Sequence, residues 1–413
     1  MKRVISLLLV LALFLTMAIS FSACKKEKKN EDKAPEETGK LSGVNAEIGR
    51  AEFINGIGGT SETYRGAVSE QSYASAQEAA QNYVYQEVVG SQNATVESTT
   101  SKGTLSDAQI SQLNLPAEVS QGLQSVEQIE VAYSIANTLE GEDGVQVLPV
   151  AAAGKSKVVV YVIKYEVDWK YYVPCPVNGE TISKRYYDSV FDNEKYQNCT
   201  LTSTTKMFVD IDADMGGQKE QGTLELTVTQ LIKHADNKVY FEQTITVGAT
   251  GLYEGMESSL GYKPGTIRAY LEENENGTMK CYIENGSKWS EGSLYGIGFT
   301  SVKELTPFYG QYLDYSYFTK TDFGFALQDE NAQQYIDTAL AQLTAMLQSG
   351  DKWDYNMYSE YYVSQGVLSG MRTDMEVVVD MSQSGVDMSI YETVQQTITC
   401  TNYGTTVVED VVK

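Results

Sequence analysis

The sequence predicts an α+β protein that is mainly antiparallel β, and three observations predict it. From about residue 199 onward, segments that alternate apolar and polar residues follow one another, with hairpin-like links such as "HADN" and "NENG". Residues 371–400 form a long hairpin of this kind, and one of its faces is rich in methionine. Residues 329–351 instead carry apolar residues at helical spacing, with Gly350 at the end.

The N-terminus has the pattern of an export signal. Lys2 and Arg3 are followed by an apolar run over residues 4–21, which ends in "FSAC". This ending resembles the lipobox of bacterial lipoproteins, although Phe21 stands where the lipobox usually has Leu. The resemblance implies that residues 1–23 are a signal peptide and that Cys24 becomes the lipid-modified first residue. The alternative is an uncleaved transmembrane anchor, because the apolar run alone could nearly span a bilayer.

In either case we expect the body of the protein to lie on the extracytoplasmic face of the bacterial cell membrane, and the lipobox implies a lipid anchor. Residues 24–40 are densely charged and almost free of apolar side chains, which predicts a flexible tether. The 413-residue chain has a formal net charge of −24, and such a surface repels nucleic-acid phosphates. Nucleic acid is therefore not an expected partner, and no particular protein partner is indicated.

Four cysteines remain besides Cys24, in a compartment that permits disulfides. Cys175 and Cys199 flank an excursion between two predicted strands, and Cys281 and Cys400 lie in two later strands. We predict a Cys175–Cys199 disulfide and consider a Cys281–Cys400 disulfide as well. Four free thiols are the competing interpretation.

Residues 41–198 predict a smaller α+β region ahead of the sheet of residues 199–413. A helix is expected at 73–90, where Ser75 can cap the first turn and Glu78 occupies the capping-box position. Strands are expected at 125–137 and 155–173. This region is either a separate small domain or an elaborated first half of the same sheet.

Residue types that carry catalysis or bind metals are sparse. His234, the only histidine, falls in the predicted polar turn "KHADNK", a poor place for catalysis because a turn does not exclude water. Asp210, Asp212 and Asp214 share one face of a predicted strand and are a weak candidate for a calcium-type cation site. A solvated acidic strand face is the simpler explanation. We therefore expect no enzyme, no cofactor and no dedicated metal site.

Three segments of the second half carry a family resemblance. They are the hairpin ending in Lys288 and Trp289, the helix "DENAQQYIDTALAQLTAMLQ" and the closing strands with "TNYG". In this order they resemble the LolA/LppX-like lipoprotein carriers and their Gram-positive relatives. The resemblance implies a strongly curved half-barrel sheet with covering helices, in which 329–351 is the lid helix. Residues 41–198 depart from the family, whose carriers begin with one helix and continue directly into strands.

The resemblance also implies a lipid or other apolar ligand between sheet and lid. Methionine is flexible and polarizable and fills irregular space, so a methionine-lined concave face could hold an acyl chain. The candidate lining consists of Met207, Met215, Leu340, Leu343, Leu347, Met371, Met375, Met381 and Met388. In the alternative, the helix fills the concavity as a solid core, and the protein is a structural or protein-interaction lipoprotein of the cell surface.

Overall fold

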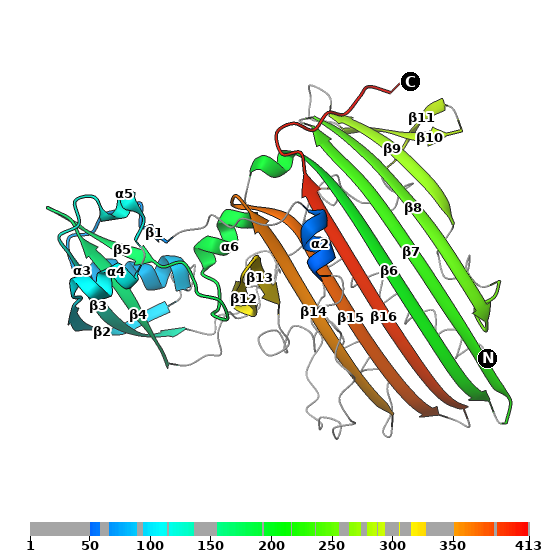
Figure 1. Ribbon diagram of the computed structural model, residues 1–413, viewed down its shortest axis with the longest axis horizontal. Helices are drawn as coiled ribbons and strands as arrows, with labels where there is room; N and C mark the ends of the chain where they lie inside the picture. The colour runs from blue at the N-terminus through cyan, green and yellow to red at the C-terminus, as the bar shows by residue number, and fades with distance from the viewer. Residues whose placement is uncertain are drawn as a thin grey trace. The chain divides into compact units, whose positions relative to one another are not determined.

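The computed structural model describes residues 50–57, 66–88, 94–113, 115–135, 155–191, 194–215, 217–235, 237–255, 264–273, 279–286, 288–293, 305, 315–327, 351–383 and 386–411. These residues form two antiparallel sheets with few helices, so the predicted fold class is confirmed (Figure 1). The larger sheet is open, and its strong curvature stays a prediction. No helix in the described ranges is long and apolar enough to cross a membrane.

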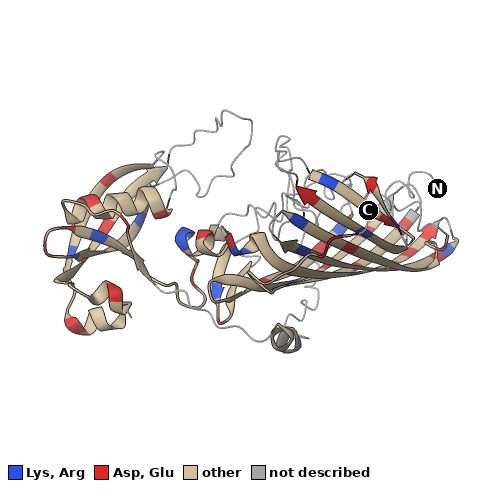
Figure 2. Ribbon diagram, turned by 90° about the horizontal axis from the view of Figure 1, so that it is seen from above, with Lys and Arg blue, Asp and Glu red and all other residues tan. Residues whose placement is uncertain are grey.

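Contacts divide the chain into two compact units. The smaller unit comprises Glu62–Asp192 and Leu313–Phe325, and the larger unit comprises Met1–Ser61, Asn193–Tyr312 and Ala326–Lys413. Acidic side chains occur on strands of both units, in keeping with the net charge of −24 (Figure 2).

The smaller unit is built on a five-stranded sheet with helices on both faces. Its strand order is β1 (Ala67–Val68), β5 (Trp169–Val173), β4 (Lys155–Lys164), β3 (Ser125–Ile135) and β2 (Ala94–Thr104). Helix α3 (Ala76–Tyr83), which continues as a π-helical turn (Val84–Val88), packs its alanines against one face. The short helices α4 (Asp107–Gln112) and α5 (Ala117–Ser120) supply Ile110 and Val119 to the core on the other face.

The first half departs from the sequence prediction at one strand. The expected strand 155–173 is two strands, because the backbone N–H of Tyr165 donates to the carbonyl of Asp168 at 2.9 Å and turns the chain. Val167, which lies within the expected strand, is 90% exposed at this turn. The cap at Ser75 is confirmed, since its side chain accepts a hydrogen bond from the backbone N–H of Glu78.

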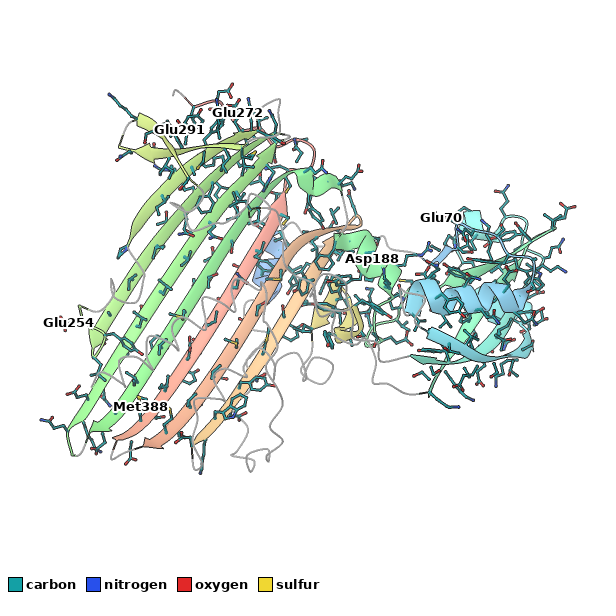
Figure 3. The ribbon with its side chains drawn as sticks, turned by 180° about the vertical axis from the view of Figure 1, so that it is seen from behind. Glu70, Asp188, Glu254, Glu272, Glu291 and Met388 are labelled. Carbon is teal, nitrogen blue, oxygen red and sulfur yellow. The ribbon has the colours of Figure 1, made fainter. Side chains whose placement is uncertain are left out.

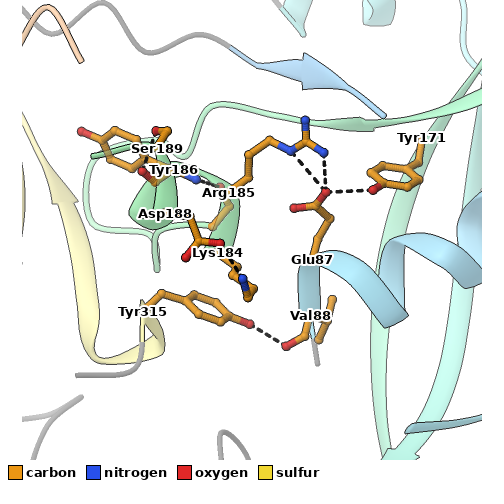
Figure 4. Close-up of polar contacts among 10 residues, drawn as sticks. Glu87, Val88, Tyr171, Lys184, Arg185, Tyr186, Asp188, Ser189 and Tyr315 are labelled. Carbon is orange, nitrogen blue, oxygen red and sulfur yellow. Dashed lines mark hydrogen bonds and ion pairs between the residues drawn. The ribbon is translucent and has the colours of Figure 1, made fainter. Parts of the chain in front are cut away.

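An ion pair joins the end of the π-helical turn to α6 (Lys184–Phe191) within the smaller unit. The Arg185 Nη2 lies 2.8 Å from Oε1 of the buried Glu87, and the Tyr171 hydroxyl donates to the same oxygen at 2.9 Å (Figure 4). The Tyr315 hydroxyl donates to the carbonyl of Val88. Tyr315 belongs to a 3-10 turn (Tyr315–Tyr317) that leads into β12 (Phe318–Thr321) and β13 (Gly324–Leu327). A charge buried at this site is thus compensated by two donors, as buried carboxylates require.

The larger unit contains nine strands of one antiparallel sheet. Their order is β11 (Lys288–Gly292), β10 (Met279–Asn285), β9 (Gly265–Glu273), β8 (Lys238–Gly251), β7 (Lys219–Ala235), β6 (Asn198–Met215), β16 (Val386–Thr401), β15 (Val367–Gln383) and β14 (Lys352–Ser364). A 3-10 turn (Glu194–Gln197) precedes β6, and α2 (Arg50–Gly56) lies against the sheet with Phe53 on Tyr362.

The register of the central strands gathers their apolar residues on one side. Ile211 of β6 lies opposite Ile390 of β16, which lies opposite Val379 of β15. We use the name apolar face for the side of β6, β7, β15 and β16 that bears Met207, Val209, Ile211, Leu224, Leu226, Val377, Val379, Met381, Met388, Ile390 and Val394. All of these side chains are buried in one core cluster.

The predicted disulfides stay a prediction, and their cysteines are divided between the two units, with Cys175 in the smaller unit and the other three in the larger unit. Cys175 is exposed, while Cys199, Cys281 and Cys400 are buried in strands of the larger sheet. The cysteine close enough to influence the pKa of Cys400 is Cys199, not Cys281.

We expect one reactive thiol among these four in the folded protein. Burial raises the pKa of the Cys199 thiol to about 12 and also raises that of Cys281, which suppresses the nucleophilic thiolate. Alkylation without reductant should label Cys175 alone, and denaturant should add the other three, as counted by peptide mass spectrometry. Failure of Cys175 and Cys199 to react even after unfolding would instead establish the predicted disulfide.

Candidate functional site

The methionines proposed to line a ligand site lie together on the apolar face. Met207, Met381 and Met388 are buried in its core cluster, and Met375 packs against that cluster. Met371 is buried on the same side of β15 but outside the cluster. Met388 lies near the start of β16, toward the end of the sheet where Glu254 follows β8 (Figure 3). The cross-strand pair Met381–Met388 places two thioethers side by side.

Several predicted site residues lie outside the part of the chain that the structure describes. The side chain of Met215 lies outside the described residues, as does the predicted lid helix up to residue 350, with Leu340, Leu343 and Leu347. The signal peptide 1–23, Cys24 and the tether 24–40 also lie outside them.

One carboxyl group interrupts the apolar face. Glu392 of β16 lies opposite Val209 of β6 on one side and Val377 of β15 on the other, between Ile390 and Val394 in its own strand. Its side chain is 1% exposed, and its buried Oε1 has no hydrogen-bond partner among the described residues. Burial raises the pKa of this carboxyl well above its usual range, which favours the neutral acid. An acid in this form offers one hydrogen-bond donor and retains acceptor capacity.

A buried tyrosine accompanies Glu392 on the same side. Tyr253, in the turn that follows β8, is 3% exposed and belongs to the core cluster of the apolar face. Burial raises the pKa of its phenol, and Glu392 and Asp210 are the acids close enough to affect it as well. The apolar face therefore has a small polar spot near its middle, made of groups that burial keeps uncharged.

The acids on the opposite face are in a different situation. Oδ1 of Asp374 accepts a hydrogen bond from Gln395, and Oδ2 lies 2.7 Å from Arg372 Nε. Glu376 accepts from the hydroxyl of Tyr391, and Glu360 from that of Tyr362. Each of these buried acids has a cross-strand or same-strand partner, as buried polar groups generally do. Glu392 is the exception, and an unpaired buried polar atom costs about 1–3 kcal/mol.

Sequence reasoning missed Glu392. The alternation in 371–400 assigns Met388, Ile390 and Val394 to one face, and residue 392 has the same parity as these three. The signal was an acidic residue at a position where the alternation expects an apolar one. A strand is usually predicted from the residues that fit the alternation, so a single exception is disregarded.

A groove of ≈ 940 Å³ lies in another part of the larger unit, beneath the segment 407–411. Lys233, Lys288, Tyr240 and Trp289 line it together with acidic and aliphatic residues of that segment. Its acid Asp410 is paired, at 2.7 Å from Lys238 Nζ and with the Tyr270 hydroxyl donating at 2.9 Å. The groove mixes both charge signs and has no buried unpaired atom among the described residues, so it defines no particular ligand.

The remaining predicted groups do not form a site in the described residues. Asp214 accepts the backbone N–H of Gly217, and no three His, Cys, Asp or Glu side chains in the described ranges gather closely enough to hold a metal ion. The prediction that His234 lies in a polar turn was wrong. His234 is a buried residue of β7 whose Nε2–H donates to the Leu305 carbonyl at 2.6 Å, and burial lowers its pKa.

The buried acid predicts a pH-dependent stability. Because the folded state retains a proton on Glu392 that the unfolded chain has lost, stability should fall as pH rises from about 4.5 toward the raised pKa. Glu392→Gln does not titrate, so its free energy of unfolding should increase relative to wild type across this window. The expected gain is about 1.4 kcal/mol for each unit of pKa shift.

Urea denaturation at several pH values measures this gain, and Glu409→Gln, at an exposed position, is the matched control. A constant difference between Glu392→Gln and wild type at all pH values would show that Glu392 is not a buried neutral acid.

Of the two surfaces, the apolar face has the more defined chemistry, because it combines an adaptable methionine lining with one unsatisfied carboxyl. The comparisons with known proteins found no family model that matches the chain and no matching curated protein. The assignment of a function therefore rests on the chain's own residues.

Proposed function

We propose that the protein is a lipid-anchored extracytoplasmic lipoprotein that binds a lipid or other apolar ligand on the apolar face. The observation that carries this proposal is the unpaired carboxyl of Glu392 within a surface of methionine and aliphatic side chains. A core that served packing alone would gain stability by replacing this acid with an apolar residue. A bound molecule with a polar end gives the carboxyl a partner and gives the methionines an apolar chain to contact.

The anchor is supported by the N-terminal residues. The run "LFLTMAISFSAC" ends in the lipobox-like sequence, and Cys24 is followed by the charged residues of the tether. Two acyl chains on one cysteine hold a protein stably at a membrane, whereas one chain gives only marginal binding. The tether then places the two folded units away from the lipid surface.

A second candidate function is a structural or protein-interaction lipoprotein of the cell surface. It is favoured by the burial of Met207, Met381 and Met388, which pack with the neighbouring valines and isoleucines in one core cluster. In that case methionine acts only as a filler of irregular space.

Lipid extraction distinguishes the two candidates. The chain from residue 25 onward keeps every described residue, and after purification from a bacterial host it should carry lipid near one molecule per chain by mass spectrometry. Met375→Trp, at a partly buried position of the apolar face, should lower this amount severalfold by filling space. Val159→Trp, at an exposed position of the smaller unit, is the control. A wild-type protein with neither bound lipid nor affinity for an apolar fluorescent dye would favour the interaction protein.

The anchor has its own test. The full chain expressed in bacteria should fractionate with membranes and carry the added mass of acyl chains on Cys24. Cys24→Ala should lose that mass and keep the signal peptide. A wild-type protein without acyl mass would exclude the lipoprotein assignment, whatever the apolar face binds.

A further inference from the structure

The apolar face limits the charge of any molecule that meets Glu392. Among the described residues of β6, β7, β15 and β16, those on this face include no Lys or Arg. His234 of β7 lies outside the core cluster of the apolar face, and its ring is hydrogen-bonded to the Leu305 carbonyl. Burial lowers the pKa of His234, which favours the neutral imidazole. A ligand with an anionic head would therefore find no counter-charge here, on a chain whose net charge is already −24.

A cationic head is disfavoured for a different reason. To pair with it, Glu392 would have to ionise between Val209 and Val377, and both charges would lose their water. The desolvation of two charges commonly exceeds the attraction between them unless further hydrogen bonds are present, and Oε1 has none within the described residues. An uncharged oxygen meets neither obstacle, because a neutral carboxyl can donate a hydrogen bond to it.

We infer that the ligand of the apolar face is an uncharged amphiphile, such as an acylglycerol or a fatty alcohol, whose hydroxyl or ester oxygen is hydrogen-bonded by Glu392. This inference rests on the proposed function and specifies the class of its ligand. The acyl chain lies along the methionines, and the head lies at the polar spot formed by Glu392 and Tyr253. Glu392 is thus the residue that selects the head group.

Few other titratable groups face Glu392. Its cross-strand neighbours Val209 and Val377 do not titrate, and β14 contributes Tyr355 opposite Val377. Tyr253 is the titratable group whose pKa responds to Glu392, and Asp210 acts on that same phenol. A change of affinity with pH near or below neutrality therefore reports on Glu392, because a phenol with a raised pKa stays protonated there.

The test compares three probes with the same apolar chain: monododecanoyl glycerol, dodecanoate and dodecylammonium. The chain from residue 25 onward is first titrated with an apolar fluorescent dye, and each probe is then titrated to displace the dye at neutral pH. We expect monododecanoyl glycerol to bind wild type about tenfold more tightly than either charged probe, which corresponds to one good hydrogen bond to a buried group.

Two variants at residue 392 separate hydrogen bonding from ionisation. Glu392→Gln keeps a donor and should retain glycerol-ester affinity within about threefold, whereas Glu392→Leu should lose about tenfold. Thermal denaturation checks that each variant is folded, and Glu409→Gln is the surface control. If Glu392→Leu does not fold, the ranking of the three probes in wild type and Glu392→Gln still decides the question.

Three kinds of binding result would contradict the inference or the proposed function. Preferred binding of dodecylammonium that is lost in Glu392→Gln would overturn the inference in favour of an ion pair, and equal or tighter binding of dodecanoate would also overturn it. Dye binding with no dependence on head group or on residue 392 would overturn the inference and leave the proposed function standing. Absence of dye and probe binding in wild type would remove the proposed function itself.

Discussion

The pairing of β6 with β16 is the constraint on which the larger unit depends. These strands are far apart in the chain, yet their ladder runs without a register shift from Thr200–Thr401 to Met215–Val386. Because side chains alternate between faces, a slip of β16 by one residue would send Glu392 and Met388 to the other side. The continuous apolar face, the burial of Glu392 and the separation of the paired acids from the unpaired one all follow from this single register.

Much of the larger sheet was predictable because its strands follow strict alternation. The period of two in 371–400 gave the correct faces for Met371, Met381 and Met388, and the strands from residue 199 onward were found in order. Alternation failed at 155–173. Apolar residues keep their alternate positions through the turn between β4 and β5, and this turn is seen only from its backbone hydrogen bond. The placement of His234 in a polar turn was also wrong, because a polar residue near a strand end gives no sign of the carbonyl that satisfies it.

The methionines of the candidate site were predictable from the sequence, whereas its unpaired acid was not. Methionine is an unusual choice for a strand, so its clustering on one face is visible in the sequence. An acid on that face becomes meaningful only when its neighbours are known, since a cross-strand partner decides whether a buried carboxyl is satisfied. Asp374 and Glu376 have such partners on the opposite face, and Glu392 does not. Partners of this kind come from strands distant in sequence, which composition and spacing do not locate.

The long separation between β6 and β16 also governs how the larger unit can reach its folded state. The strands from β6 to β11 pair with sequence neighbours and can form early as local hairpins. One edge of β6 then stays open until β16 arrives, after all of the intervening strands have been made. Such non-local closure is slow, and an open edge with apolar side chains recruits other chains. In the proposed exported lipoprotein, this period of vulnerability to aggregation would last until nearly the whole chain had crossed the membrane.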